Sequence, residues 1–222
     1  MIDEAYTSRN IDCTNYNELA RLIVESFPRH HDETDPFRVL ITTVLSQRSR
    51  DENTEIASRN LFGKYNSVDE LSTAKPQDLY ELIKPAGLYN RKAEKIVEIA
   101  KTIQNQYDGK VPSSLEELTK LPGVGRKTAN IVLYVSFGIP ALAVDTHVHR
   151  ISNRLGWVRT KMPEQTEEAL KKLLDPSLWG PINGSMVEFG RNVCKPITPK
   201  CEKCILNRCC KYYSGISKKK DQ

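Results

Sequence analysis

The ten residues Leu121–Asn130, Leu-Pro-Gly-Val-Gly-Arg-Lys-Thr-Ala-Asn, constrain the fold more than any other stretch of this 222-residue chain. A periodic apolar segment at 115–121 leads into them and a second at 129–135 leads out, which predicts two helices joined by a tight turn. Gly123 and Gly125 can take positive φ and leave the backbone bare. The amides that open the second helix then point outward at the positive end of its dipole, where a phosphate binds well.

Two polar side chains near this turn are candidates for chemistry. Lys127 lies in the first turn of the expected second helix, beside the expected anion site, and Asp145 follows 18 residues later. A nucleotide-binding phosphate loop is excluded, because that motif needs a glycine directly before Lys-Thr and Arg126 stands there. For the Pro-Gly-x-Gly motif taken alone, a helix turn with a surface lysine remains the alternative.

The rest of the chain also shows helical periodicity. Helix starts are marked by Asp35-Pro36 and by Asp51, and Pro28 stops the first helix. No alternating apolar run bounded by a hairpin turn indicates a sheet. The sequence therefore predicts an all-α fold. The expected helices cover about 19–27, 36–44, 51–61, 67–74, 76–83, 90–107, 115–121, 129–135, 145–155, 163–174 and 181–193.

Composition bounds the class of protein. Hydrophobic residues make up 39% of the chain, enough for a packed core, but no apolar run reaches the length of a membrane span. Met1 opens onto Ile-Asp-Glu-Ala, which resembles no secretory signal, so we expect an intracellular protein, in the cytoplasm and on the nucleoid. The net charge of +5 is uneven, because residues 191–222 carry +7 and residues 1–190 carry −2. Concentrated positive charge favours a polyanionic partner, although Lys218–Lys220 taken alone indicates a solvated tail.

The cysteines are concentrated at the C-terminal end. Six occur, namely Cys13, Cys194, Cys201, Cys204, Cys209 and Cys210. Disulfides are disfavoured in a chain expected to be intracellular, and Cys13 is expected to be a buried thiol. A four-cysteine zinc site would show two Cys-x-x-Cys pairs and only one is present, whereas uneven spacing is typical of a 4Fe–4S cluster. Cys209 and Cys210 compete for the fourth ligand position, and the alternative for Cys209 is a small apolar packing residue.

These motifs together resemble those of the endonuclease III family of DNA repair glycosylases, which belongs to the helix-hairpin-helix superfamily. The resemblance spans about residues 16–212, and it places Lys127 and Asp145 where the family keeps its catalytic lysine and aspartate. The spacing of the cysteines is similar to that of the family's cluster motif. It implies a 4Fe–4S cluster, selects Cys210 over Cys209, and gives as ligands Cys194, Cys201, Cys204 and Cys210.

The resemblance also implies a discontinuous arrangement of two helical domains. Residues 29–139 would form a helical barrel domain with the helix-hairpin-helix, and residues 1–28 with 140–222 would form the iron–sulfur domain. The active site would lie in the cleft between them, with Lys127 and Asp145 on opposite walls.

The implied activity is base excision repair by a bifunctional DNA glycosylase and AP lyase. The enzyme, expected to be a monomer, would flip an oxidised pyrimidine out of duplex DNA. Lys127 would then attack the sugar C1′, expel the base and form a Schiff base, and β-elimination would cut the strand. Asp145 would either stabilise positive charge on the sugar or shuttle a proton, and the sequence leaves both roles open.

Two loops would fill the gap that a flipped base leaves. The loop Leu45–Asp51 departs from the family pattern, because Gln47 comes one place before the expected glutamine and Arg48 stands in its place. The loop Gly87–Lys92 resembles the family pattern closely, with Leu88 as an apolar wedge; the alternative for Leu88 is a core leucine. The expected DNA contacts are Gln47, Arg48, Leu88, Tyr89, Asn90, Gly123, Val124, Gly125, Arg126, Lys195 and Lys200.

Three other functions compete with this one. A mismatch-specific thymine or uracil glycosylase of the same superfamily would use a water nucleophile, but such relatives usually lack a lysine at position 127. A helix-hairpin-helix module that only binds DNA would leave Asp145 without a role. A scaffold protein stapled by zinc would keep the cysteines but none of the chemistry.

Overall fold

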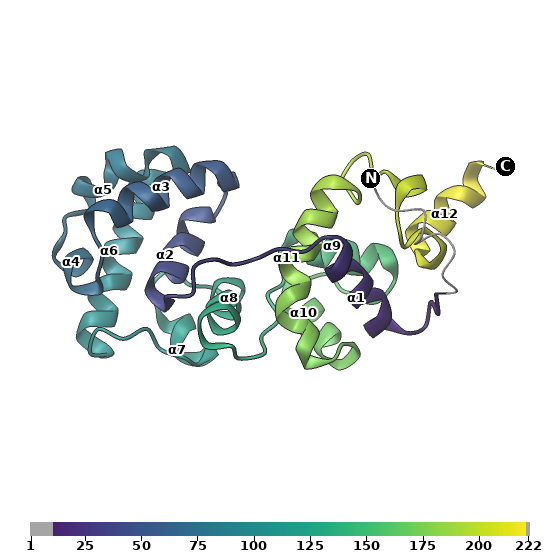
Figure 1. Ribbon diagram of the computed structural model, residues 1–222, viewed down its shortest axis with the longest axis horizontal. Coiled ribbons are helices and arrows are strands. Elements are labelled where there is room, and N and C mark those ends of the chain that lie inside the picture. Colours follow the sequence, from purple (N-terminus) through teal and green to yellow (C-terminus); the bar gives the residue numbers. More distant parts are fainter. Residues whose placement is uncertain (1–10, 221–222) are drawn as a thin grey trace. The chain divides into compact units, whose positions relative to one another are not determined.

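The computed structural model describes residues 11–220, with side chains as far as Ile216. Regular structure in this range is entirely helical and includes no strand, which confirms the all-α prediction. The chain divides into two compact units, Met1–His30 with Pro140–Gln222, and His31–Ile139 (Figure 1). Within the described range, none of the helices combines the length and the apolar character that crossing a bilayer requires.

The unit His31–Ile139 is built around the long helix α6. Helices α4 and α5 pack on α6, and α8 packs on α2. Its central leucine and isoleucine side chains are fully buried, and each contributes about 1.5–3 kcal/mol relative to exposure. The elements are α2 (Pro36–Ser46), α3 (Asp51–Lys64), α4 (Val68–Thr73), α5 (Pro76–Ile83), the 3-10 helix η2 (Lys84–Ala86), α6 (Tyr89–Gln106), α7 (Leu115–Lys120) and α8 (Arg126–Phe137).

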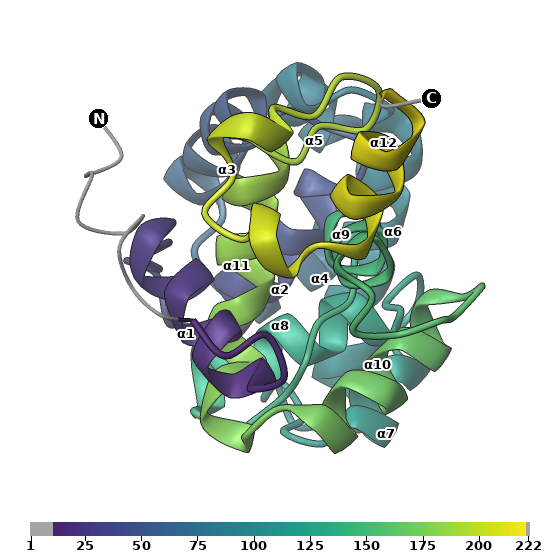
Figure 2. The same cartoon turned by 90° about the vertical axis from the view of Figure 1, so that its right-hand side faces the viewer.

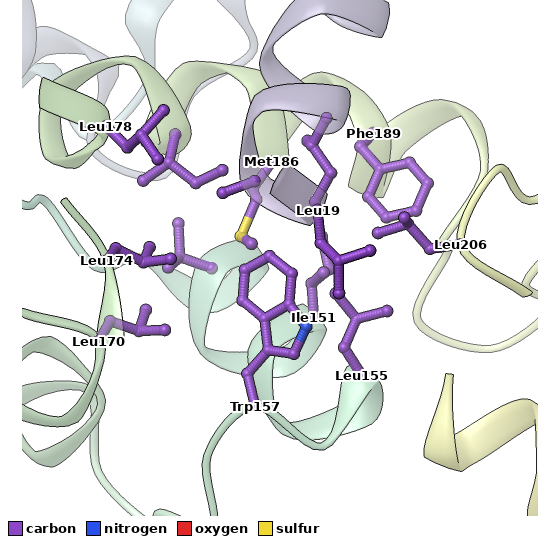
Figure 3. Packing of buried hydrophobic residues seen from close by; sticks show 14 of the residues in the cluster. Leu19, Ile151, Leu155, Trp157, Leu170, Leu174, Leu178, Met186, Phe189 and Leu206 are labelled. Atoms are coloured by element: carbon purple, nitrogen blue, oxygen red, sulfur yellow. The ribbon is translucent and has the colours of Figure 1, made fainter. Parts of the chain in front are cut away.

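The second unit joins the N-terminal helix to the C-terminal part of the chain. Helix α1 packs along α11, and α12 lies against α9 (Figure 2). Trp157 is buried in its core together with Leu19, Ile151 and Met186 (Figure 3). The described elements are α1 (Tyr16–Ser26), α9 (Thr146–Leu155), α10 (Pro163–Leu173), α11 (Pro176–Asn192), η3 (Cys201–Lys203), η4 (Asn207–Cys209) and α12 (Lys211–Lys220).

Helix caps explain both the correct and the wrong boundaries. Asp35 caps α2 by accepting a hydrogen bond from the Arg38 amide (2.8 Å), with proline at the next position as predicted. The prediction that a helix starts at Pro181 was wrong, because α11 begins at Pro176 under an Asp175 cap of the same kind. Pro181 lies inside that helix. Helix α12 was not predicted at all.

Candidate catalytic and cluster-binding sites

The hairpin of α7 and α8 is formed by a short turn at residues 121–125. Gly123 has φ +70°, as predicted, and a Cβ there would lie 2.9 Å from the Lys95 side chain. The prediction of positive φ was wrong for Gly125, which has extended backbone (φ −91°, ψ 172°) because it is the N-cap of α8. The Val124 side chain is 5% exposed and anchors the turn in the core, and its backbone amide donates a hydrogen bond to the carbonyl of Leu121 (3.1 Å).

Lys127 is the second residue of α8 and is half-buried. No side chain caps this helix at Gly125, and its first turn carries no acidic residue. The amides of an uncapped helix start, together with the dipole, favour an anion. The hairpin therefore places a lysine next to a surface suited to phosphate.

Asp145 is the N-cap of α9 and is half-buried. Its Oδ1 accepts hydrogen bonds from the amides of His147 (2.8 Å) and Val148 (2.9 Å). Burial lowers the pKa of the neighbouring His147, and the negative charge of Asp145 opposes that shift. The two amide bonds fix the orientation of the carboxylate on the rigid end of a helix. Lys127 belongs to one unit and Asp145 to the other.

Both loops expected to contact DNA have unusual backbone at their tips. Arg48 (φ 54°) and Leu88 (φ 51°) are left-handed, a conformation that costs free energy in any residue but glycine. Leu88 is 53% exposed, so the alternative of a core leucine is wrong. Gln47 and Tyr89 are half-buried, while Asn90 is exposed like Arg48. Left-handed backbone at residues other than glycine is typical of loops whose conformation serves a function.

Lys92 is a polar side chain whose importance the sequence analysis missed. It is 4% exposed, and its Nζ donates hydrogen bonds to the carbonyl oxygens of Leu45 (2.6 Å) and Ala86 (2.9 Å). Burial lowers its pKa to about 8. The available sequence signal was a cation in the first turn of a helix, where the dipole disfavours it.

Four cysteines outside any disulfide line one cavity beside the end of α9; they are Cys194, Cys201, Cys204 and Cys210. Arg154 reaches the same cavity, and its Nη1 donates to Cys194 Sγ (3.6 Å) and to the carbonyl of Lys195 (2.7 Å). Arg150 donates to the carbonyl of Cys194 (2.9 Å). Two arginines of one helix thus hold the start of the loop that follows Cys194.

Cys210 is buried, and Cys194, Cys201 and Cys204 are partly buried. Burial raises the pKa of Cys204 to about 12 and also raises those of Cys201 and Cys210, and charge on the neighbouring thiols adds to each shift. Across the described residues, no group of three or more histidine, cysteine, aspartate or glutamate side chains is arranged to hold a single metal ion. The structure therefore gathers the four cysteines around one cavity.

The remaining two cysteines correct the sequence analysis. Cys13 is exposed and forms a disulfide with Cys209, with a Cα–Cα distance of 5.1 Å. The predictions of a buried Cys13 thiol and of no disulfide were therefore wrong, whereas Cys209 packs against the hydrophobic core as its alternative role predicted. The pair is 196 residues apart, so spacing alone could not reveal the contact. Of the neighbouring residues Cys209 and Cys210, Cys209 is in the disulfide. The thiol that lines the cavity is therefore that of Cys210.

Comparison with known proteins places this geometry in context. A model of the HhH-GPD superfamily of base excision DNA repair proteins matches residues 41–176. Endonuclease III of Thermotoga maritima is 69% identical over 196 residues, which cover 88% of this chain and 92% of that protein. A structure of a trapped endonuclease III–DNA covalent intermediate is similar with a TM-score of 0.85 and 34% identity, covering 93% and 99% of the two chains. A thermostable thymine-DNA glycosylase is similar with a TM-score of 0.83 and 28% identity, covering 92% and 100%.

Proposed function

Because the chain belongs to the endonuclease III family, within the HhH-GPD superfamily of base excision DNA repair proteins, we propose that it is a bifunctional DNA glycosylase and AP lyase. Its substrate is duplex DNA that carries an oxidised pyrimidine or an abasic site. The observation that carries the proposal is the position of Lys127, half-buried in the first turn of α8 beside an uncapped helix start.

Recognition begins with extrusion of the damaged base, because its reactive atoms are inaccessible inside the duplex. The hairpin amides bind a backbone phosphate close to the lesion. The exposed Leu88 enters the stack as an apolar wedge, and Arg48 lies at the tip of the other gap-filling loop. The remaining contacts with DNA use Gln47, Tyr89, Asn90, Gly123, Val124, Gly125, Arg126, Lys195 and Lys200.

Chemistry starts when the neutral amine of Lys127 attacks C1′ of the extruded nucleotide. A C–N bond forms as the N-glycosidic bond breaks, and the base leaves with the electron pair and takes up a proton. The attacking nitrogen loses a proton, and the sugar ring opens to a Schiff base on Lys127 as the C1′–O4′ bond breaks and the ring oxygen takes up a proton. Loss of a C2′ proton then expels the 3′ phosphate by β-elimination, which cuts the strand.

Asp145 supplies a fixed negative charge near the sugar. Its Oδ1 is held by two amides at the start of α9, so the carboxylate is positioned before the reaction begins. That arrangement supports the role of stabilising positive charge on the sugar as the base leaves. A preorganised group of this kind contributes about 10²–10³ in rate.

The cysteines of the second unit fit a 4Fe–4S cluster held by Cys194, Cys201, Cys204 and Cys210. Four thiols around one cavity would repel one another as thiolates, and a bound cluster would supply the positive charge that stabilises them. The cluster serves as a structural staple. It would hold the loop between Lys195 and Lys200 in place to contact the DNA backbone. On this assignment His31–Ile139 is the helical barrel domain and the other unit is the iron–sulfur domain.

Borohydride trapping tests the proposal. Duplexes with thymine glycol, uracil, a G·T mismatch or an abasic site are incubated with and without borohydride, which reduces a Schiff base to a stable adduct. We expect trapping on thymine glycol and abasic DNA, with the adduct on Lys127, and none for Lys127→Gln, which should still bind DNA. An adduct peptide without Lys127 would show that the nucleophile is another residue.

Mismatch-specific glycosylase activity is the second candidate, favoured by the similarity to the thymine-DNA glycosylase. It predicts removal of thymine or uracil from the mismatch duplexes and no trapped adduct.

Iron and zinc analysis of the purified protein separates the 4Fe–4S cluster from a zinc site. We also propose that the enzyme acts as a monomer on the nucleoid.

A further inference from the structure

Lys92 occupies a position that a lysine normally avoids. It is the fourth residue of α6, whose first turn has no acidic residue and whose N-cap, Leu88, makes no side-chain cap. A positive charge there opposes the helix dipole, and burying an ammonium costs free energy unless it is well bonded. A methionine, whose side chain is of similar length, would avoid both costs. The position therefore requires an explanation other than core packing.

The two hydrogen bonds of Lys92 satisfy helix ends that have lost their own donors. Leu45 lies in the last turn of α2, and the Ser49 amide that would bond to it in a longer helix bonds to Ser46 instead (3.1 Å). Ala86 ends the 3-10 helix η2. Carbonyl groups at helix ends favour a cation. One ammonium group therefore joins the ends of two elements that are far apart in the sequence.

A DNA-facing loop leaves each of those two helix ends. Gln47 and Arg48 follow Leu45 within three residues, and Gly87 and Leu88 follow Ala86 directly. Three residues other than glycine have positive φ within residues 11–220, namely Arg48, Leu88 and Asp108. Two of these three lie at the tips of the loops that Lys92 joins. Such backbone persists only where the surrounding structure fixes it.

We propose that Lys92 is a positioning residue that locks both gap-filling loops in their DNA-binding shape before DNA is bound. The inference rests on the proposed function, which assigns the loops to the gap left by the extruded base. Loops that are already ordered lose less entropy when they enter the DNA stack. Lys92 is buried and bonded to backbone carbonyls, so we expect its effect on base extrusion and not on bond breaking.

Hydrogen exchange of the free protein tests the lock without any chemistry. Lys92→Met should speed amide exchange at least about 10-fold at residues 47–50 and 87–90, while α8 and the rest of the unit keep their protection. Lys101→Met is the matched control, because it removes an exposed lysine from the same helix and should change neither region. Uniformly faster exchange across the unit, or no change in the loops, would overturn the proposal.

A pair of substrates tests the consequence for repair. A thymine glycol duplex requires base extrusion, whereas a duplex with a preformed abasic site has no base to expel. Lys92→Met should slow single-turnover cleavage of the first at least about 10-fold and reduce trapping on the second by about 2-fold or less. Equal losses on both substrates would indicate general destabilisation and contradict the proposal.

A second variant covers failure to fold. If Lys92→Met shows no cooperative thermal transition, the same comparisons are made with Lys92→Gln, which removes the charge but keeps a polar group at this position. Failure of the lock is distinct from failure of the proposed function. A wild-type protein that forms no adduct on any duplex would refute the glycosylase and lyase assignment, and the exchange comparison would still decide the role of Lys92.

Discussion

Both units of the molecule contain at least one loop that we assign to DNA contact, but the two units fix these loops by different means. In His31–Ile139, one buried ammonium bonds to two backbone carbonyls. In the other unit, the loop from Lys195 to Lys200 is held by two arginines, by the cysteine site and by a disulfide next to it. The first device rests on hydrogen bonds within a packed core, and the second on cross-links in a region with little apolar burial of its own. The amount of apolar surface buried beneath a loop therefore determines how much covalent or metal support that loop needs.

Among these supports, loss of the proposed cluster should have the largest effect on stability. Cys204→Ser replaces a soft thiolate with a poor ligand, so we expect loss of iron and of the brown colour of an iron–sulfur protein. Because metal binding contributes to folding, the melting temperature should fall by more than about 10 °C. Iron analysis and thermal unfolding followed by circular dichroism provide the measurement. Cys13→Ser is the control, and it should keep its iron.

Removal of the disulfide should have the next largest effect. Cys13→Ser opens the link between the N-terminal segment and Cys209, and a disulfide of this kind contributes about 2–4 kcal/mol. The variant should melt several degrees below the wild type without reductant. With reductant present throughout, both proteins should melt at the same temperature. Equal melting in both conditions would show that the disulfide does not form in solution.

The pH dependence of stability should reveal the contribution of Lys92 in the unit His31–Ile139. Its pKa is about 8 in the folded protein, below the ordinary 10.5, so the unfolded chain binds more protons between these values. The wild type should therefore gain stability relative to Lys92→Met as pH rises from 8 to 10.5, by at most about 3 kcal/mol. Urea unfolding at pH 7.5, 9 and 10.5 measures the difference. A constant difference across this range would contradict the lowered pKa.

The same contrast shows what could be predicted from the sequence. The hairpin, its lysine and the start of α9 at Asp145 were predictable because each depends on neighbouring residues, namely glycine in a turn or an aspartate cap. The cysteine motif was likewise visible as a spacing. The links that hold these parts in place were not, since the Cys13–Cys209 and Lys92–Leu45 contacts join residues far apart in the sequence. Local sequence patterns thus reveal the candidate functional residues, whereas the contacts that support those residues depend on tertiary packing.

Salt dependence of DNA binding should show the smallest effect and compare the two loops directly. Each lysine that meets a phosphate adds about 0.9 to the slope of log affinity against log salt. Replacing both Lys195 and Lys200 with alanine should therefore reduce the slope by up to about 2, and Lys92→Met should leave it unchanged because its ammonium is buried. Fluorescence anisotropy with an abasic-analogue duplex at several salt concentrations gives the slopes. A reduced slope for Lys92→Met would mean that this lysine, or a charged loop residue that it positions, contacts a phosphate. An unchanged slope for the double variant would remove the loop between Lys195 and Lys200 from the DNA interface.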